Sequence, residues 1–153
     1  MKITFCGHSN FIPTPELEQK MLSIFENEIG DSYAELYLGG YGNFDSFALS
    51  CGKKYKQTHS NIKLLFITPY MSLSYQKNHL EYDKLLYDEV IYPEIEKVPP
   101  KFAIYYRNQW MIEKSDLVIA YVRNEWGGAY KTYMYAQRKN KRTLNLANIN
   151  CQT

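Results

Sequence analysis

Cysteine is scarce in this sequence, and the positions of the three cysteines exclude a disulfide framework. Cys6, Cys51 and Cys151 lie far apart, and none belongs to a C-x-x-C motif. Isolated cysteines of this kind are typical of reduced thiols, so we expect a cytoplasmic protein. Asp88 and Glu89 stand side by side, but no histidine completes a metal-binding set. We therefore expect neither a metal nor a cofactor.

The sequence also has little net charge and no long apolar run. Its 18 Lys and Arg residues and 16 Asp and Glu residues leave a net charge of +2. Non-specific binding of nucleic acid depends on positive charge, so this balance predicts no nucleic-acid partner. No apolar run approaches the roughly 20 residues of a membrane-spanning helix. The first apolar run ends at Gly7, too early for a secretory signal, so we expect no membrane association.

What the chain does contain suits one folded domain. It has 153 residues, and 45% of them are hydrophobic, which is enough for a core. We expect a single domain over residues 1–146 and a polar tail over residues 147–153. The 15 tyrosines are an unusual feature, since tyrosine suits half-buried surfaces.

Runs of strand length alternate with segments of helical periodicity. The helical segments are residues 14–30, 44–55, 102–114 and 129–140. Strands separated by helices predict a parallel sheet with right-handed crossovers. We therefore predict a three-layer, Rossmann-like α/β domain with a central parallel sheet of about five strands. The predicted strands are Lys2–Cys6, Ala34–Leu38, Ile62–Thr68, Leu117–Val122 and Arg142–Leu146.

One long stretch, Tyr70–Pro100, has no regular pattern apart from a short helical piece near Tyr82–Tyr87. It is rich in tyrosine and contains three prolines. A segment of this length in a compact domain is usually a lid, a binding loop or a mobile insertion.

Glycine-rich loops follow two of the predicted strands. Gly39, Gly40 and Gly42 precede a helix, and Gly127 and Gly128 precede another. Free N–H groups and the helix dipole at such a turn attract an anion, and glycine lets it approach. The alternative is that these glycines only form tight turns. Neither loop is a P-loop or a dinucleotide G-x-G-x-x-G motif.

The carboxyl ends of parallel strands lie at the same edge of the sheet, and ligands of open α/β sheets bind there. His8 could contact a ligand, act in acid–base chemistry or be an ordinary polar loop residue. Asp45 could cap its helix or hold a ribose hydroxyl. The full set of candidate ligand- and phosphate-binding residues is Gly7, His8, Ser9, Gly39, Gly40, Gly42, Asn43, Asp45, Arg107, Trp126, Gly127 and Gly128.

Two residues are candidates for catalysis. Arg107 falls on an apolar and aromatic helix, where a guanidinium needs a partner. That partner is either a ligand phosphate or carboxylate, or a salt bridge with Asp116 or Glu113. Glu125 is either an acid or base, or a solvated loop carboxylate.

The order of these pieces resembles the SLOG superfamily, which includes LOG cytokinin-activating hydrolases, DprA-like proteins and small DUF1273-type proteins. The pieces are "GHS", "YLGGYGNFD" and the segment Arg107–Lys141. The resemblance implies cleavage of the N-glycosidic bond of a nucleoside 5′-monophosphate. It also implies that Arg107 is the site arginine, that Gly127 and Gly128 hold phosphate, and that the protein forms a homodimer.

The sequence departs from the LOG motif at the residues that carry its chemistry. Trp126 stands where the motif has proline, and Tyr133 and Met134 replace its two glutamates. An oxocarbenium-like transition state needs a nearby negative charge. Our leading interpretation is therefore a sensor or sequestering protein that binds a nucleotide or an ADP-ribose-like ligand at the carboxyl edge of the sheet. One alternative is an N-glycosidase or deoxyribosyltransferase-like enzyme using Glu125, and another is an interaction module without a ligand.

Overall fold

The structure is a computed structural model that describes residues 1–148. Most of the predicted tail, 147–153, lies outside the described residues, as does Cys151. Among the described residues, no helix is long and apolar enough to cross a bilayer.

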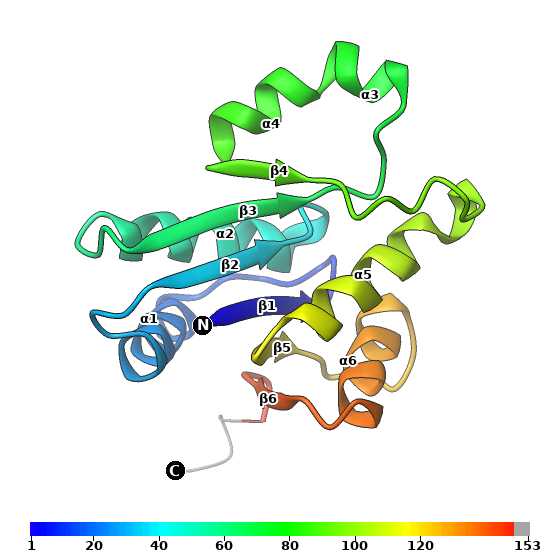
Figure 1. Cartoon of the computed structure of the whole chain (residues 1–153). Coiled ribbons are helices and arrows are strands. Elements are labelled where there is room, and N and C mark those ends of the chain that lie inside the picture. The colour runs from blue at the N-terminus through cyan, green and yellow to red at the C-terminus, as the bar shows by residue number, and fades with distance from the viewer. Residues whose placement is uncertain (149–153) are drawn as a thin grey trace.

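A single parallel sheet of six strands runs through the molecule (Figure 1). Its strand order is β4-β3-β2-β1-β5-β6. The parallel α/β architecture is confirmed, but the sheet has six strands where the sequence predicted about five. The strands are β1 (Lys2–Gly7), β2 (Ala34–Leu38), β3 (Ile62–Ile67), β4 (Glu89–Ile91), β5 (Leu117–Tyr121) and β6 (Arg142–Asn145).

The additional strand lies in the segment that the sequence left irregular. β4 has three residues and pairs with β3 through Leu65↔Glu89, Phe66↔Val90 and Ile67↔Ile91. Two helices precede it, α3 (Leu73–Asn78) and α4 (Leu80–Leu86), and they lie beyond this edge of the sheet (Figure 1). The short helical piece predicted near Tyr82–Tyr87 corresponds to α4, whereas α3 and β4 were not predicted. These elements are too short to produce a clear period, because a three-residue strand shows only one alternation.

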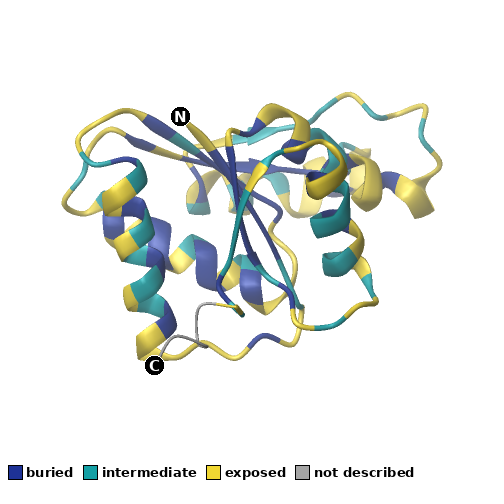
Figure 2. Ribbon diagram, turned by 90° about the horizontal axis from the view of Figure 1, so that it is seen from below, coloured by how far each residue is buried: buried dark blue, intermediate teal, exposed yellow. Residues whose placement is uncertain are grey.

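The other helices cover the two faces of the sheet. α1 (Pro15–Glu28) and α2 (Gly42–Lys56) lie on one face, and α5 (Ala103–Lys114) and α6 (Gly128–Arg138) lie on the other (Figure 1). A 3₁₀ turn, η1 (Pro100–Phe102), leads into α5. The sides of the helices that face the strands are buried (Figure 2). β5 is apolar throughout because helices cover both of its faces.

Close packing of α2 on β1 places the start of α2 at the carboxyl edge of the sheet. A Cβ atom on Gly7 would lie 2.3 Å from the ring of Phe44, which is fully buried. Phe11, Phe47 and Tyr121 pack around the same ring. Gly7 is therefore required for the helix to approach the strand.

The strand order reverses direction at β1. The chain builds β2, β3 and β4 on one side of β1 and then places β5 on its other side. A crevice forms at the carboxyl ends of strands at such a reversal, and this is where open α/β sheets bind ligands.

Candidate functional site

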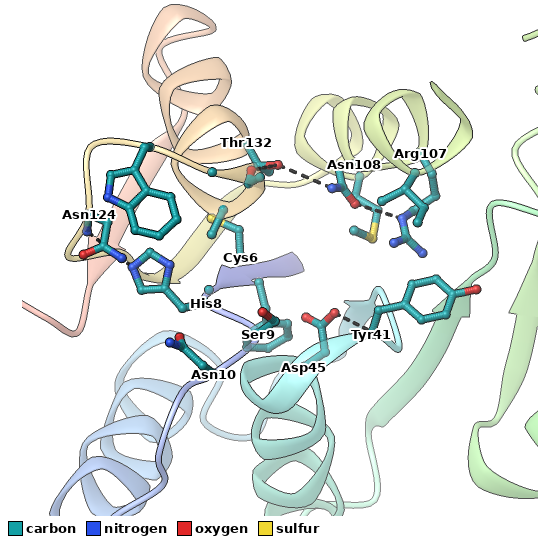
Figure 3. A pocket seen from close by; sticks show the side chains of 18 residues that line it. Cys6, His8, Ser9, Asn10, Tyr41, Asp45, Arg107, Asn108, Asn124 and Thr132 are labelled. Carbon is teal, nitrogen blue, oxygen red and sulfur yellow. Dashed lines mark hydrogen bonds between the residues drawn. The ribbon is translucent and has the colours of Figure 1, made fainter. Parts of the chain in front are cut away.

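A cavity of about 410 Å³ lies at this reversal, between the loops after β1 and β5 and the helices α2, α5 and α6 (Figure 3). Eight of the predicted site residues line it: Gly7, His8, Ser9, Asp45, Arg107, Trp126, Gly127 and Gly128. Five do not: Gly39, Gly40, Gly42, Asn43 and Glu125. The structure thus brings together the loops after β1 and β5, while the loop after β2 contributes only Tyr41 to the lining.

The turn between β5 and α6 is open to the cavity. A Cβ atom on Gly127 or Gly128 would have no atom within 4 Å, and Gly127 has a φ of 91°. No side chain of the described chain caps the first turn of α6. Trp126, which precedes the two glycines, is 71% exposed. The turn therefore offers backbone N–H groups and an aromatic face to an incoming molecule.

The loop after β2 is closed by the protein's own atoms. A Cβ atom on Gly40 would lie 2.4 Å from the ring of Phe66, and one on Gly42 would lie 3.0 Å from Cα of Ser9. Both glycines have positive φ, 75° and 85°. The N–H of Asn43, in the first turn of α2, donates to the carbonyl oxygen of Ser9 at 3.0 Å. These glycines therefore allow a tight, packed turn, which was the alternative raised by the sequence.

Arg107 is 2% exposed and binds backbone carbonyls from two strands. Its Nη1 donates to the carbonyl oxygens of Gly39 at 2.8 Å and Ile67 at 2.5 Å, and its Nε donates to Oδ1 of Asn108 at 2.9 Å. Neither of the two predicted salt bridges is present, and within residues 1–148 no carboxylate lies within ion-pair distance of Arg107. Burial lowers the pKa of the guanidinium, and the charge of Asp45 opposes this shift.

Asp45 caps the start of its own helix. Its Oδ2 accepts a hydrogen bond from the N–H of Tyr41 at 3.0 Å. Burial raises the pKa of this carboxyl to about 6, although the Tyr41 N–H and the charge of Arg107 both act to lower it. The carboxylate therefore exchanges its proton just below neutral pH, beside the guanidinium of Arg107.

His8 holds the loop after β5 in place. Its Nε2 accepts hydrogen bonds from the N–H of Arg123 at 2.9 Å and the N–H of Asn124 at 3.4 Å. Burial, and then the charge of Arg123, lower the pKa of the imidazole. His8 is therefore neutral near pH 7 with its acceptor nitrogen occupied, which is the arrangement of a positioning residue.

Glu125 and Cys6 differ in their position relative to the cavity. Glu125 is exposed and outside the cavity. Cys6 lines the cavity, but burial raises the pKa of its thiol to about 12, so it is not a nucleophile at neutral pH. Asn108, which the sequence analysis missed, accepts from Arg107 and donates to Oγ1 of Thr132 at 3.4 Å (Figure 3). Its position next to Arg107 was the available signal.

Neither a protein-family model nor a curated protein matches this sequence. The solved structures with a similar fold include two DNA processing proteins. One is DNA processing protein A of Helicobacter pylori, described for its single-stranded DNA binding mode, with 19% identity and a TM-score of 0.62. The likeness covers 94% of this chain and 63% of that one. The other is DNA processing protein A (DprA) of Streptococcus pneumoniae, with 13% identity and a TM-score of 0.64, covering 93% of this chain and 48% of that one.

These similarities show that the chain shares the Rossmann-like fold of DNA processing protein A. The chain spans between about half and two thirds of the length of those two proteins.

The comparison contradicts two predictions from the sequence. The H. pylori protein binds single-stranded DNA. The expectation of a small-molecule nucleotide ligand and no nucleic acid is therefore wrong, and nothing in the comparison supports the glycosidase, the ligand-free module or a dimer. The error came from using net charge, which averages over the whole surface and says nothing of the local charge at one edge of a sheet.

Proposed function

We propose that this chain binds single-stranded DNA along the carboxyl edge of its sheet. The observation that carries the proposal is Arg107, a buried guanidinium that lines the cavity and has no ion-pair partner within the described chain. A buried charge is costly unless an opposite charge or hydrogen bonds compensate it. Its bonds to carbonyl oxygens supply part of that compensation, and a phosphate group of a DNA backbone would supply an opposite charge.

The opposite wall of the cavity suits the same ligand. The free first turn of α6 at Gly127 and Gly128 would bind phosphate oxygens through backbone N–H groups. Trp126 beside it would stack on a base, and stacking on an aromatic ring is how proteins bind single strands without sequence preference. Arg123 and Lys131, both exposed, flank this turn and add positive charge near the path of the backbone.

Binding to labelled oligodeoxythymidylate of about 12 nucleotides, within the range of single-strand site sizes, tests the proposal. We expect fluorescence anisotropy to give a Kd of about 1–100 µM at physiological salt, and the affinity to fall as salt is raised. A duplex of the same length should bind more weakly, because its bases are not available for stacking. Absence of binding to the single strand at low salt would exclude the proposed function.

Trp126→Ala provides the site-specific test. Trp126 is exposed, so its removal should leave folding unchanged, while binding of the single strand should weaken roughly tenfold. Tyr33→Ala is a matched control, because Tyr33 is 49% exposed and lies just before β2, at the amino ends of the strands and away from the cavity. Equal losses of DNA affinity in the two variants would mean that the DNA strand binds elsewhere on the protein.

Three narrower assignments belong to the same proposal. We infer a DUF1273-type member of the superfamily from the sequence pieces that carry the resemblance. A single domain over residues 1–146 is supported by the one sheet that all six strands share. A cytoplasmic location is supported by the free thiols of Cys6 and Cys51.

A further inference from the structure

A second cavity, of about 430 Å³, lies next to the first and has tyrosine walls. It is enclosed by the loop after β2, the end of β3 and the helices α3 and α4, which belong to the stretch that the sequence left irregular. The tyrosines that line it are Tyr41, Tyr70, Tyr75, Tyr82 and Tyr87.

Tyr41 connects this cavity with the first one. It lines both, and its side chain is 46% exposed. The guanidinium carbon of Arg107 lies 5.4 Å from the centre of its ring on the side of the first cavity. Figure 3 shows the ring extending away from Asp45, toward the part of the chain that follows β3. A chain molecule bound at Arg107 therefore reaches the second cavity by passing a single residue.

The two cavities differ in charge. The first contains the guanidinium of Arg107 and the free start of α6, whereas no lysine or arginine is among the described residues that line the second. A phosphate group thus finds positive charge in the first cavity and none in the second. The second is suited to an uncharged group.

The walls of the second cavity suit a flat group with polar edges. Phe66 and Tyr87 are stacked with their ring centres 5.0 Å apart, so one aromatic wall is already rigid. The hydroxyl of Tyr75 donates to Oδ2 of Asp83 at 2.7 Å, which fixes a second wall and places a carboxylate in the lining. Burial raises the pKa of Tyr87 to about 12, so its hydroxyl stays neutral and can donate. Aromatic faces with hydroxyl and carboxylate groups at their margins match a nucleobase.

We propose that the tyrosine-walled cavity binds a nucleobase of the same DNA strand whose phosphate lies at Arg107. This inference rests on the proposed function and adds a second binding position to it. The position is tolerant of sequence, because every base has an aromatic face. A neighbouring groove shares Tyr82 with this cavity and is also lined by Lys53, which would receive the next part of the backbone.

Tyr82→Ala, tested with two strands, separates base binding from backbone binding. Tyr82 is 62% exposed on α4, so the fold does not depend on its ring. One strand is oligodeoxythymidylate of about 12 nucleotides, and the other has the same backbone with abasic positions. We expect the variant to bind the thymidylate strand roughly tenfold more weakly and the abasic strand unchanged. Tyr33→Ala, the matched exposed tyrosine, should change neither.

Each of the other outcomes overturns a different statement. If Tyr82→Ala bound both DNA strands as the wild type does while Trp126→Ala bound them more weakly, no base would bind in the second cavity. The proposed function would still hold. Equal weakening of both strands would show that Tyr82 contacts the backbone and not a base. Failure of the wild-type protein to bind either strand would remove the proposed function itself.

Photocrosslinking of the unmodified protein gives an answer that does not depend on any variant. Strands that carry 5-iododeoxyuridine at single positions should crosslink to Tyr70, His79 or Tyr82, identified by mass spectrometry of the digested protein. Crosslinks confined to Trp126 would contradict the second position while supporting the first.

Discussion

The Nε2 atom of His8 accepts a hydrogen bond from the backbone N–H of Arg123 at 2.9 Å, so the loop after β1 holds the loop after β5. The two residues are 115 positions apart in the sequence. This bond sets the path of the chain that leads to Trp126 and the open turn at Gly127 and Gly128. The site thus depends on an imidazole that must remain neutral, because a protonated ring has no acceptor nitrogen.

His8→Gln should lower the free energy of unfolding by about 1–2 kcal/mol at about pH 7.5, and by less at lower pH. Because the pKa of His8 is lowered in the folded protein, the unfolded state binds more protons below pH ~6.5. The stability that His8 contributes is therefore complete above that pH and is lost as pH falls through the lowered folded pKa. Urea unfolding of both proteins across this range measures the effect. A difference between them that grows on acidification would contradict the assigned hydrogen bond.

Asp45→Asn should stabilise the protein above pH 6, by about 1–3 kcal/mol. The pKa of Asp45 is raised to about 6 in the folded protein, so between the ordinary aspartate pKa and pH 6 the folded state binds more protons than the unfolded state. The ionised carboxylate therefore opposes folding, fully so above about pH 6. This effect disappears as pH falls toward the ordinary pKa of an aspartate. Asn keeps an oxygen that can accept from the N–H of Tyr41.

Unfolding of Asp45→Asn by urea at about pH 7.5 checks this, with Asp31→Asn, an exposed aspartate, as the control. Asp45→Asn should also bind single-stranded DNA more tightly than the wild type at neutral pH, because it removes a negative charge that acts on Arg107. A destabilised Asp45→Asn variant at that pH would show that the carboxylate has a partner that compensates its burial.

Gly7→Ala and Gly128→Ala should differ sharply in stability. The added methyl at Gly7 would lie 2.3 Å from the ring of Phe44, and a clash of this kind in a packed core costs about 1–3 kcal/mol or more. The methyl at Gly128 would meet no atom within 4 Å. Thermal unfolding should therefore show a lowered Tm for the first variant and an unchanged one for the second. Equal Tm values would mean that α2 can move away from β1.

The parallel sheet could be predicted because β5 and the helix periods are local patterns in the sequence. The role of the glycines after β2 could not, because the atoms that close that loop come from Phe66 and Ser9, which are distant in sequence. Arg107 shows the same limit. The sequence indicated that a buried arginine needs partners, but the partners are carbonyl oxygens at the ends of two other strands. A hydrogen bond to a backbone carbonyl cannot be predicted from a sequence pattern, because every residue carries the same carbonyl group.

Arg107→Lys should reduce both stability and DNA binding, although it preserves the positive charge. Nη1 of the guanidinium donates to the carbonyl oxygens of Gly39 and Ile67, while Nε donates to the side chain of Asn108. A single ammonium group cannot take the places of both nitrogens, so at least one of these three acceptors loses its donor, at about 1–3 kcal/mol.

Urea unfolding and anisotropy with the thymidylate strand measure the two losses, and Arg138→Lys, an exposed arginine at the end of α6, is the control. If Arg107→Lys lost stability but bound DNA as the wild type does, the guanidinium would serve only to hold β2 and β3 together. The phosphate would then have to lie at the start of α6 alone. A loss of binding at conditions where the variant is still folded would instead place the phosphate against Arg107, because only the geometry of the charge differs between the two proteins.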